Sequence, residues 1–218
     1  MKNIKRGIIF LITIIIVISS NFFSYGYAFY DVLYRADNVV ISIGTWEYQT
    51  NTSVFFTDFE NFPEYGGGVM LIEIGGLDFI TKNVVRGDKS IDQKIGDSSI
   101  RLFNKGIFGS RTYFIGLKLI SFYIGLTEYN MSYYKGFNVE ISSNGYDWST
   151  VYHNEAYKDS FDLIEIDMES ILSQGVELYG GNLATQLTPL QFRIIADSSF
   201  SSAGCNIDNL TIEYTDIY

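Results

Sequence analysis

Three carboxylates spaced two residues apart, in Glu165-Ile166-Asp167-Met168-Glu169, form the first group of side chains that could do chemistry. A strand sends alternate side chains to opposite faces, so the carboxylates would share one face and the apolar residues the other. Two carboxyl groups about 5–5.5 Å apart suit a retaining glycoside hydrolase, one as acid and one as nucleophile. A solvated outer face produces the same pattern, and this is the interpretation that we favour.

His153 is the only histidine, which limits the catalytic chemistry open to the chain. It excludes zinc sites with two or more histidine ligands, and the single cysteine, Cys205, excludes a site made of cysteines alone. A Ser-His-Asp triad would have to use His153, which ends a predicted strand, and the sequence contains no nucleophile elbow. We therefore expect an exposed histidine and predict no catalytic residues.

Aromatic side chains are the better lead to function. A sugar ring stacks its apolar C–H face on Trp or Tyr, while nearby polar groups fix its hydroxyls. The segment Thr127–Lys135 combines such groups in a predicted loop, where binding residues tend to lie. The alternative is that these tyrosines only cover the edges of a sheet. Trp148 is expected to pack against its own sheet as part of the core. The predicted ligand-binding residues are Tyr129, Tyr133, Tyr134, Glu128 and Asn130.

The elements that must position these residues are strands. The chain is rich in Ile, Tyr, Phe, Thr and Ser, and short alternating runs are separated by Gly, Asn, Asp and Ser, which is typical of a sandwich or barrel. One short helical turn is expected near Glu169–Ser173. The predicted strands lie near 38–48, 53–60, 69–74, 77–85, 98–104, 111–126 (broken at Gly116), 135–142, 146–152, 161–168, 190–196 and 206–214.

Three segments are more specific. Phe137, Val139 and Ile141 alternate with polar residues, which predicts a strand with one core face and one wet face. The run Leu117–Ile124 is apolar on both sides and should pass through the middle of a sheet. Ser143-Asn144-Gly145-Tyr146 predicts a tight turn in which Asn and Gly supply positive φ angles.

The first 28 residues predict an export signal. Lys2, Lys5 and Arg6 precede an apolar run of about 11 residues, too short for the roughly 20 that span a bilayer, and Gly26-Tyr27-Ala28 suits signal peptidase. An uncleaved leader, which would keep the protein on a bacterial cell surface, is the alternative. The predicted organisation is a signal peptide over 1–28, a lead-in segment with one strand over 29–52 and a β-sandwich domain over 53–218.

The net charge limits the kinds of partner that the chain could bind, and the cysteine content limits how it could be stabilised. Removal of the leader leaves 12 Lys and Arg against 25 Asp and Glu, a net charge of −13. Such a balance repels nucleic acid and anionic membranes, and suits neutral ligands, cations or basic surfaces. Cys205 has no second cysteine within the chain to pair with, so stability must come from packing or bound ions. Pairing between two chains stays open.

Four segments occur in an order that carries a family resemblance: 57–62 (TDFENF), 96–102 (GDSSIRL), 139–151 (VEISSNGYDWSTV) and 206–212 (NIDNLTI). Together they resemble the galactose-binding-like jelly-roll modules of secreted bacterial proteins, which include many carbohydrate-binding modules. The resemblance covers residues 53–218 and implies the fold more strongly than the function, because such sandwiches host many activities.

The resemblance also implies a structural calcium ion where the first and last strands meet. A hard cation takes six to eight oxygens from carboxylates and carbonyls. The matching positions are Glu60 and Asp208, with Asp88 in the 86–97 loop as a third ligand. The alternative is that Glu60 and Asp208 only cap strand ends in water.

The run Glu165–Glu169 also resembles the E-I-D-x-E strand of laminarinase-type glycoside hydrolases. Only 49 residues follow Glu169, Ser170-Ile171-Leu172 departs from the usual continuation, and no aromatic-lined cleft is evident upstream. These departures weigh against catalysis.

The sequence therefore predicts an all-β fold, a jelly-roll β-sandwich of two antiparallel sheets behind a signal peptide and a short lead-in strand. The expected function is a secreted, non-catalytic module that binds carbohydrate or another extracellular ligand, without nucleic acid and without membrane insertion once the leader is cleaved. One alternative is a surface or assembly protein in which Val39–Ile43 pairs with a sheet edge of another copy. Another is a glycoside hydrolase that uses Glu165, Asp167 and Glu169.

Overall fold

The computed structural model describes residues 50–64, 67–126, 134–154, 161–179, 181–198 and 204–217. The predicted signal peptide, and the lead-in segment up to residue 49, lie outside these ranges. The compact unit considered below spans Thr50–Ile217. Among the described residues, no helix has both the length and the apolar character that a membrane span requires.

Nearly all regular structure in the described ranges is antiparallel strand, and the elements follow one another in this order: β1 (Thr50–Thr57), β2 (Val69–Ile74), β3 (Leu77–Gly87), β4 (Ser99–Ser110), β5 (Leu119–Leu126), β6 (Tyr134–Ser142), β7 (Ser149–Asn154), β8 (Asp162–Asp167), α2 (Met168–Ser173), β9 (Val176–Glu177), β10 (Leu183–Ala184), β11 (Gln191–Ser198) and β12 (Gly204–Ile217).

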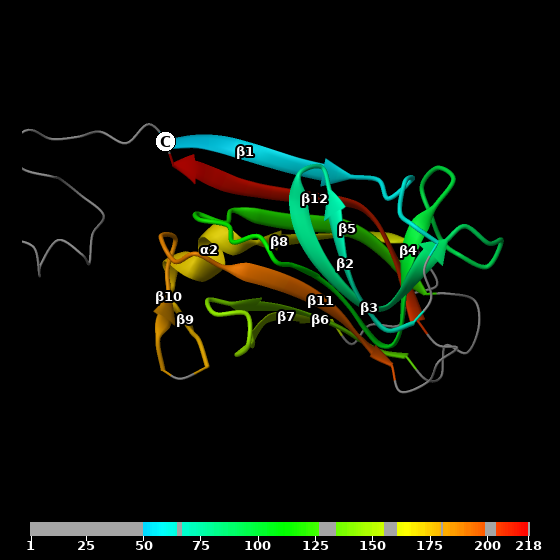
Figure 1. The fold of residues 1–218 in the computed structure, drawn as a ribbon. Coiled ribbons are helices and arrows are strands. Elements are labelled where there is room, and N and C mark those ends of the chain that lie inside the picture. The colour runs from blue at the N-terminus through cyan, green and yellow to red at the C-terminus, as the bar shows by residue number, and fades with distance from the viewer. Residues whose placement is uncertain are drawn as a thin grey trace, which may run out of the picture. The chain divides into compact units, whose positions relative to one another are not determined.

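The strands form two layers. One layer has the order β1–β12–β5–β8, and the other has the order β4–β11–β6–β7, with the β2–β3 hairpin added beside β4 (Figure 1). These two orders are those of an eight-stranded jelly roll, in which strands that follow one another in sequence often lie in opposite layers. The predicted fold class, a jelly-roll β-sandwich, is confirmed.

The two layers are joined because β3 and β4 bend from one into the other. Before the bend in β4, residues 100–103 pair with β12, and after it residues 107–109 pair with β11. The bend occurs where Asn83, Asn104 and Lys105 have positive φ angles of 53°, 46° and 54°. Gly106 follows at a close approach of the strands, since a Cβ there would lie 2.7 Å from the carbonyl oxygen of Asn83.

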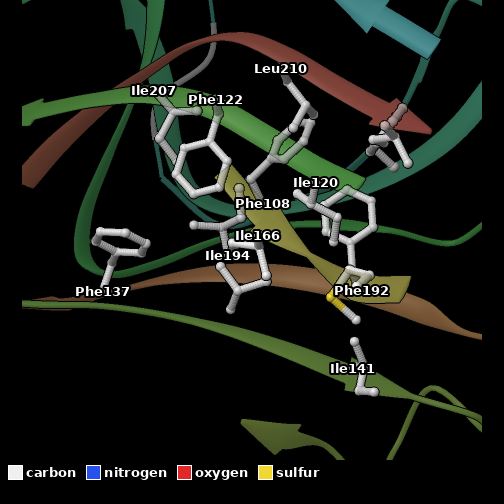
Figure 2. Packing of buried hydrophobic residues seen from close by; sticks show 14 of the residues in the cluster. Phe108, Ile120, Phe122, Phe137, Ile141, Ile166, Phe192, Ile194, Ile207 and Leu210 are labelled. Atoms are coloured by element: carbon white, nitrogen blue, oxygen red, sulfur yellow. The ribbon is translucent and has the colours of Figure 1, made fainter. Parts of the chain in front are cut away.

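The core lies between the layers (Figure 2). Phe122 of β5 meets Phe137 of β6 edge-to-face, with ring centroids 5.7 Å apart, and so links the two layers directly. Ile120, Phe122 and Ile124 face this core, and β5 lies between β12 and β8, as expected for the apolar run Leu117–Ile124. Burial of such side chains stabilises the fold by about 1.5–3 kcal/mol each.

Two further expectations concern buried side chains. Phe137, Val139 and Ile141 are at most 3% exposed, so the predicted core face of this strand is confirmed. Cys205 is fully buried in β12 between β4 and β5, which leaves its sulfur out of reach of a second chain.

The segment before β5 differs from the expectation. Residues 111–118 are not a strand of the sheet; they form a connection with one bridge, Phe114 to Leu190. Among the described residues, no strand continues up to the break predicted at Gly116; this glycine lies within the connection, with φ +58°, and a Cβ there would lie 2.5 Å from Thr215 Oγ1. The expected helical turn is α2, whereas the two short strands β9 and β10 fall in a segment for which no strand was predicted.

Candidate functional site

Among the described residues, a groove of about 420 Å³ lies on the outer face of the second layer. Residues of β2, β3, β4 and β11 form its floor, and the β6–β7 turn and the segment after β4 form its walls. The side chains that matter most below are Lys82, Arg111, Tyr113, Tyr146, Trp148 and Arg193.

A row of residues directly opposite one another across four strands supports the floor of the groove, and two of them, Ile80 and Arg193, line it. Glu140 of β6 faces Arg193 of β11, which faces Gly109 of β4, which faces Ile80 of β3. Phe192 and Ile194 are fully buried, so the alternation of a strand sends Arg193 outward. The same alternation that builds the core therefore brings these four residues together on the outer face.

Arg193 is held on two sides. Its Nε and Nη2 donate to Glu140 Oε2 at 2.7 and 2.6 Å, and its guanidinium carbon lies 4.2 Å from the centroid of the Trp148 ring. A guanidinium over an indole is attracted to the ring's negative face, and the charge-assisted bonds to Glu140 fix its orientation. The result is a half-buried indole in a defined position at the wall of the groove.

Gly109 leaves the space that Arg193 occupies. A Cβ at Gly109 would lie 2.7 Å from the Cβ of Arg193 and 3.0 Å from the carbonyl oxygen of Phe192. Contacts this short require a shift of the backbone or of the arginine stem. Glycine at this position therefore permits the packing of Arg193 across β4.

The β6–β7 turn carries Tyr146 and Trp148. Ser142 Oγ accepts from the backbone N–H of Asn144 and Gly145, and Asn144 Oδ1 accepts from those of Tyr146 and Asp147. Of the two residues expected to have positive φ, only Gly145 does, at +77°. Asn144 instead acts through its side chain, and its Asx-type bonds hold a longer turn than the predicted one.

Gln191 connects the two walls. Its Nε2 donates to the carbonyl oxygen of Arg111 at 2.5 Å. Its Oε1 packs against Gly145, since a Cβ on Gly145 would lie only 2.7 Å from this oxygen. Gln191 is only 7% exposed, so this contact is shielded from water. Arg111 and Tyr113 are thereby held opposite the β6–β7 turn.

A separate acidic corner lies where the end of β1 approaches β12. Glu60 Oε1 accepts from the backbone N–H of Asp97 and Ser98, and Asp208 Oδ2 accepts from that of Ile95. Both carboxylates therefore hold the loop that precedes β4. The pKa of Asp208 is raised to about 6, mainly by burial; backbone N–H donors lower it, and the negative charges of Glu60 and Asp58 raise it.

Of the three predicted calcium ligands, Glu60 and Asp208 bind the same loop, whereas Asp88 is exposed and its backbone carbonyl accepts from Lys94 Nζ at 2.7 Å. Within the described ranges, no three His, Cys, Asp or Glu side chains converge in a way that could hold a metal ion. Calcium binding by Glu60, Asp88 and Asp208 stays a prediction.

The predicted tyrosine loop falls largely outside the described residues. This is so for Glu128, Tyr129, Asn130 and Tyr133, and only the backbone of Tyr134 is described, paired with Ser198. That loop precedes β6, whereas the groove lies beside the turn that follows β6.

The carboxylates of 165–169 lie on exposed positions, as a solvated face requires. Asp167 has a structural role, because its Oδ1 accepts from the backbone N–H of Ser170 at 2.8 Å and caps α2. Glu169 belongs to that helix rather than to β8, so the period of two ends before it. His153 is exposed on β7, as predicted, with Nδ1 hydrogen-bonded to Asn138 Oδ1.

Sequence reasoning missed the groove for an identifiable reason. Trp148 was expected in the core, but it is half-buried on the outer face and packs on Arg193. The alternation of Gln191 and Arg193 with Phe192 and Ile194 marks a polar outer face that could have been noticed. The position of Arg193 beside Glu140 and Gly109 depends on the register between strands, which no local sequence pattern encodes.

No protein-family model matches the chain, and no curated protein is similar to it. Solved structures similar to it include the K2 cleaved adhesin domain of Lys-gingipain, with 11% identity and a TM-score of 0.46, covering 73% of this chain and 99% of that one. The CBM22-1 xylan-binding domain of Xyn10C from Paenibacillus barcinonensis has 13% identity and a TM-score of 0.41, covering 73% and 92%. TmCBM61, solved with β-1,4-galactotriose, has 13% identity and a TM-score of 0.38, covering 74% and 94%.

Carbohydrate-binding modules and adhesin domains are thus among the structures similar to this chain, in line with the resemblance seen in its sequence. Similarity at this level says nothing of what this chain binds.

Proposed function

We propose that the chain is a non-catalytic module that binds a saccharide in the groove on the outer face of the second layer. The observation that carries this proposal is the exposure of aromatic rings beside converging polar groups. Tyr146 is 88% exposed and Tyr113 is 46% exposed, and both line the groove with Trp148. Exposed rings of this kind offer the stacking surface that the C–H face of a sugar takes.

Polar groups in the groove suit the hydroxyls of such a ligand. Asn144, Gln191 and Arg193 line the same space and provide both donors and an acceptor. Because Arg193 is fixed by Glu140 and Trp148, it offers its remaining N–H groups without a further ordering cost. A volume of about 420 Å³ lies within the roughly 300–1,000 Å³ of ligand pockets.

A glycan-binding screen on the purified protein tests the proposal. We expect Tyr146→Ala and Trp148→Ala to weaken binding of the selected glycan by about tenfold or more, because each removes a stacking surface. Tyr179→Ala is the matched control, since Tyr179 is 73% exposed but does not line the groove. Thermal melting of each variant separates loss of a contact from loss of the fold.

Two results would contradict the proposal. One is the absence of saccharide binding across the screen, and the other is binding that survives both groove substitutions. Secretion and the cleaved leader stay predictions of the sequence.

A further inference from the structure

The charged residues that line the groove are all cationic: Lys82, Arg111 and Arg193. The chain as a whole has the opposite balance, with 25 Asp and Glu against 15 Lys and Arg. The groove is therefore a local exception on an acidic protein. A concave site lined by one sign of charge concentrates ligands of the other sign.

The three cations differ in how they are paired. Arg193 is an ion-pair partner of Glu140, with an N–O distance of 2.6 Å. Across the part of the chain that the structure describes, Lys82 and Arg111 have no ion pair with a carboxylate, and both side chains are exposed. Asp147, the acidic residue of the adjoining turn, accepts from Asn144 Nδ2 at 3.0 Å and does not line the groove.

Apolar residues flank Lys82, and a backbone hydrogen bond fixes the position of Arg111. Lys82 lies directly between Val69 and Ile107 in the register of β2, β3 and β4. Val69, Ile80 and Ile107 line the groove with it, so the floor beside Lys82 is apolar. Arg111 follows β4, and its backbone N–H donates to the carbonyl oxygen of Asp78 at 2.7 Å.

We infer that the saccharide bound by this groove carries an anionic group, a carboxylate or a sulfate ester, that is held by Lys82 and Arg111. The inference rests on the proposed function and narrows its ligand class to acidic sugars. An Arg or Lys side chain donating to a carboxylate or sulfate oxygen makes a charge-assisted hydrogen bond, about twice as strong as a neutral one. The aromatic rings take the sugar ring, and the two cations take its charge.

A saccharide fits these features better than a polyphosphate chain does. The formal net charge of −10 repels a dense polyanion such as nucleic acid at long range. A sugar with one charge per residue places its anionic group within the groove, where the local cations act at short distance. Salt screens the long-range repulsion more strongly than it screens the short contacts between the groove cations and the anionic group.

A matched set of probes tests the inference by titration calorimetry. Trigalacturonate, its methyl ester and α-1,4-linked galactotriose share one linkage and differ mainly in charge, and a κ-carrageenan tetrasaccharide supplies a sulfate ester in place of a carboxylate. We expect trigalacturonate or the sulfated probe to bind at least about tenfold more tightly than the neutral probes. Lys82→Gln and Arg111→Gln should reduce the ratio of charged-probe affinity to neutral-probe affinity to about twofold or less. The affinity for the neutral probes should not change.

Lys89→Gln is the control, because Lys89 is exposed in the loop after the far end of β3 and does not line the groove. It removes the same charge and should leave the ratio unchanged. Equal binding of charged and neutral probes, or binding of neutral probes alone, overturns the inference while the proposed function stands. Failure of every saccharide to bind overturns both, and a preference that survives both groove substitutions overturns the assignment to Lys82 and Arg111.

Discussion

Arg193 shows how one residue can order a binding surface. Its guanidinium bonds to Glu140 on one side and covers the Trp148 ring on the other, so three segments of the chain meet at one side chain. The bonds to a carboxylate compensate the desolvation of a half-buried charge. The same pairing leaves Lys82 and Arg111, rather than Arg193, as the cations whose charge is available to a ligand.

Asp208 gives a prediction of pH dependence, because its pKa is about 6 in the folded protein and near 3.8 when exposed. The folded state therefore binds a proton more tightly than the unfolded state does. The stability from this group is complete below about pH 4 and is lost as the pH rises through about 6. In a chelating buffer, we expect the free energy of unfolding to fall by about 1–2 kcal/mol between pH 4.5 and 7 on account of this carboxyl.

Urea unfolding across this pH range measures the effect. Asp208→Asn should remove this part of the decrease in the free energy of unfolding with pH. Asp78→Asn, at an exposed position, should leave the decrease unchanged. Added calcium separates the two interpretations of the acidic corner. If an ion binds Glu60 and Asp208, the slope reverses with calcium, because protonation then displaces the ion. Superimposable curves with chelator and with calcium would remove calcium from this corner.

At the residue scale, sequence reasoning located some functional groups and missed others. The family resemblance implied that Glu60 and Asp208 lie near each other, and in the structure both carboxylates accept hydrogen bonds from the loop before β4. Sequence reasoning placed Trp148 in the core, because an aromatic after a turn packs equally well on either face of a sheet. The face is decided by contact with Arg193, which is 45 residues away in sequence and invisible to local patterns.

At the scale of the element, β4 links the floor of the groove to the core. Gly109 lets Arg193 pack across the strand, so Gly109→Ala should displace the guanidinium from Trp148. We expect a loss of about 1–3 kcal/mol in the free energy of unfolding, together with a changed tryptophan fluorescence spectrum. Chemical unfolding followed by fluorescence measures both.

Gly76→Ala supplies the comparison for this variant. Gly76 has φ +81° and open space around it, so an alanine there strains the backbone without touching the groove. It should lower stability and leave the tryptophan spectrum of the folded protein unchanged. An unchanged spectrum for Gly109→Ala as well would show that Arg193 does not depend on the missing Cβ.

Strands with a strong alternating or continuous apolar pattern were predictable from the sequence. The limits of β2, the core face of β6 and the central place of β5 follow from side-chain period and hydrophobicity. The second half of β4 was not foreseen, because the polar residues Asn104 and Lys105 resemble a turn. In the structure they form a bend within the strand, with positive φ angles.

At the scale of the molecule, the jelly-roll order was predicted through resemblance rather than derived from the residues. Pairings such as β11 between β4 and β6 join segments far apart in sequence. Many registers satisfy the same alternation, and the packing of both layers selects one. The groove therefore emerges only with the complete fold, since its floor needs four strands in register.

Assembly through a sheet edge is the second function that the structure supports with an observation. Val54 and Phe56 are 60% and 57% exposed on β1, and among the described strands β1 pairs with β12 alone. An edge strand with exposed apolar residues is a template for another strand. The assembly hypothesis predicts that residues 29–218 elute as a larger species than residues 50–218 in size-exclusion chromatography.

Phe56→Ser in the longer form should shift its elution toward that of a monomer, because it removes apolar surface from the same face. A monomer for both lengths contradicts assembly and leaves saccharide binding as the better account of the molecule.

The pairing of β1 with β12 has a consequence for biosynthesis. Thr50 faces Ile217 and Thr57 faces Leu210, so the first described strand pairs with a strand that is synthesised long after it. Contacts of such long range form slowly, and this ladder is absent while the final strand is unmade. The β1–β12 ladder of a nascent chain therefore stays open until translation has passed residue 217.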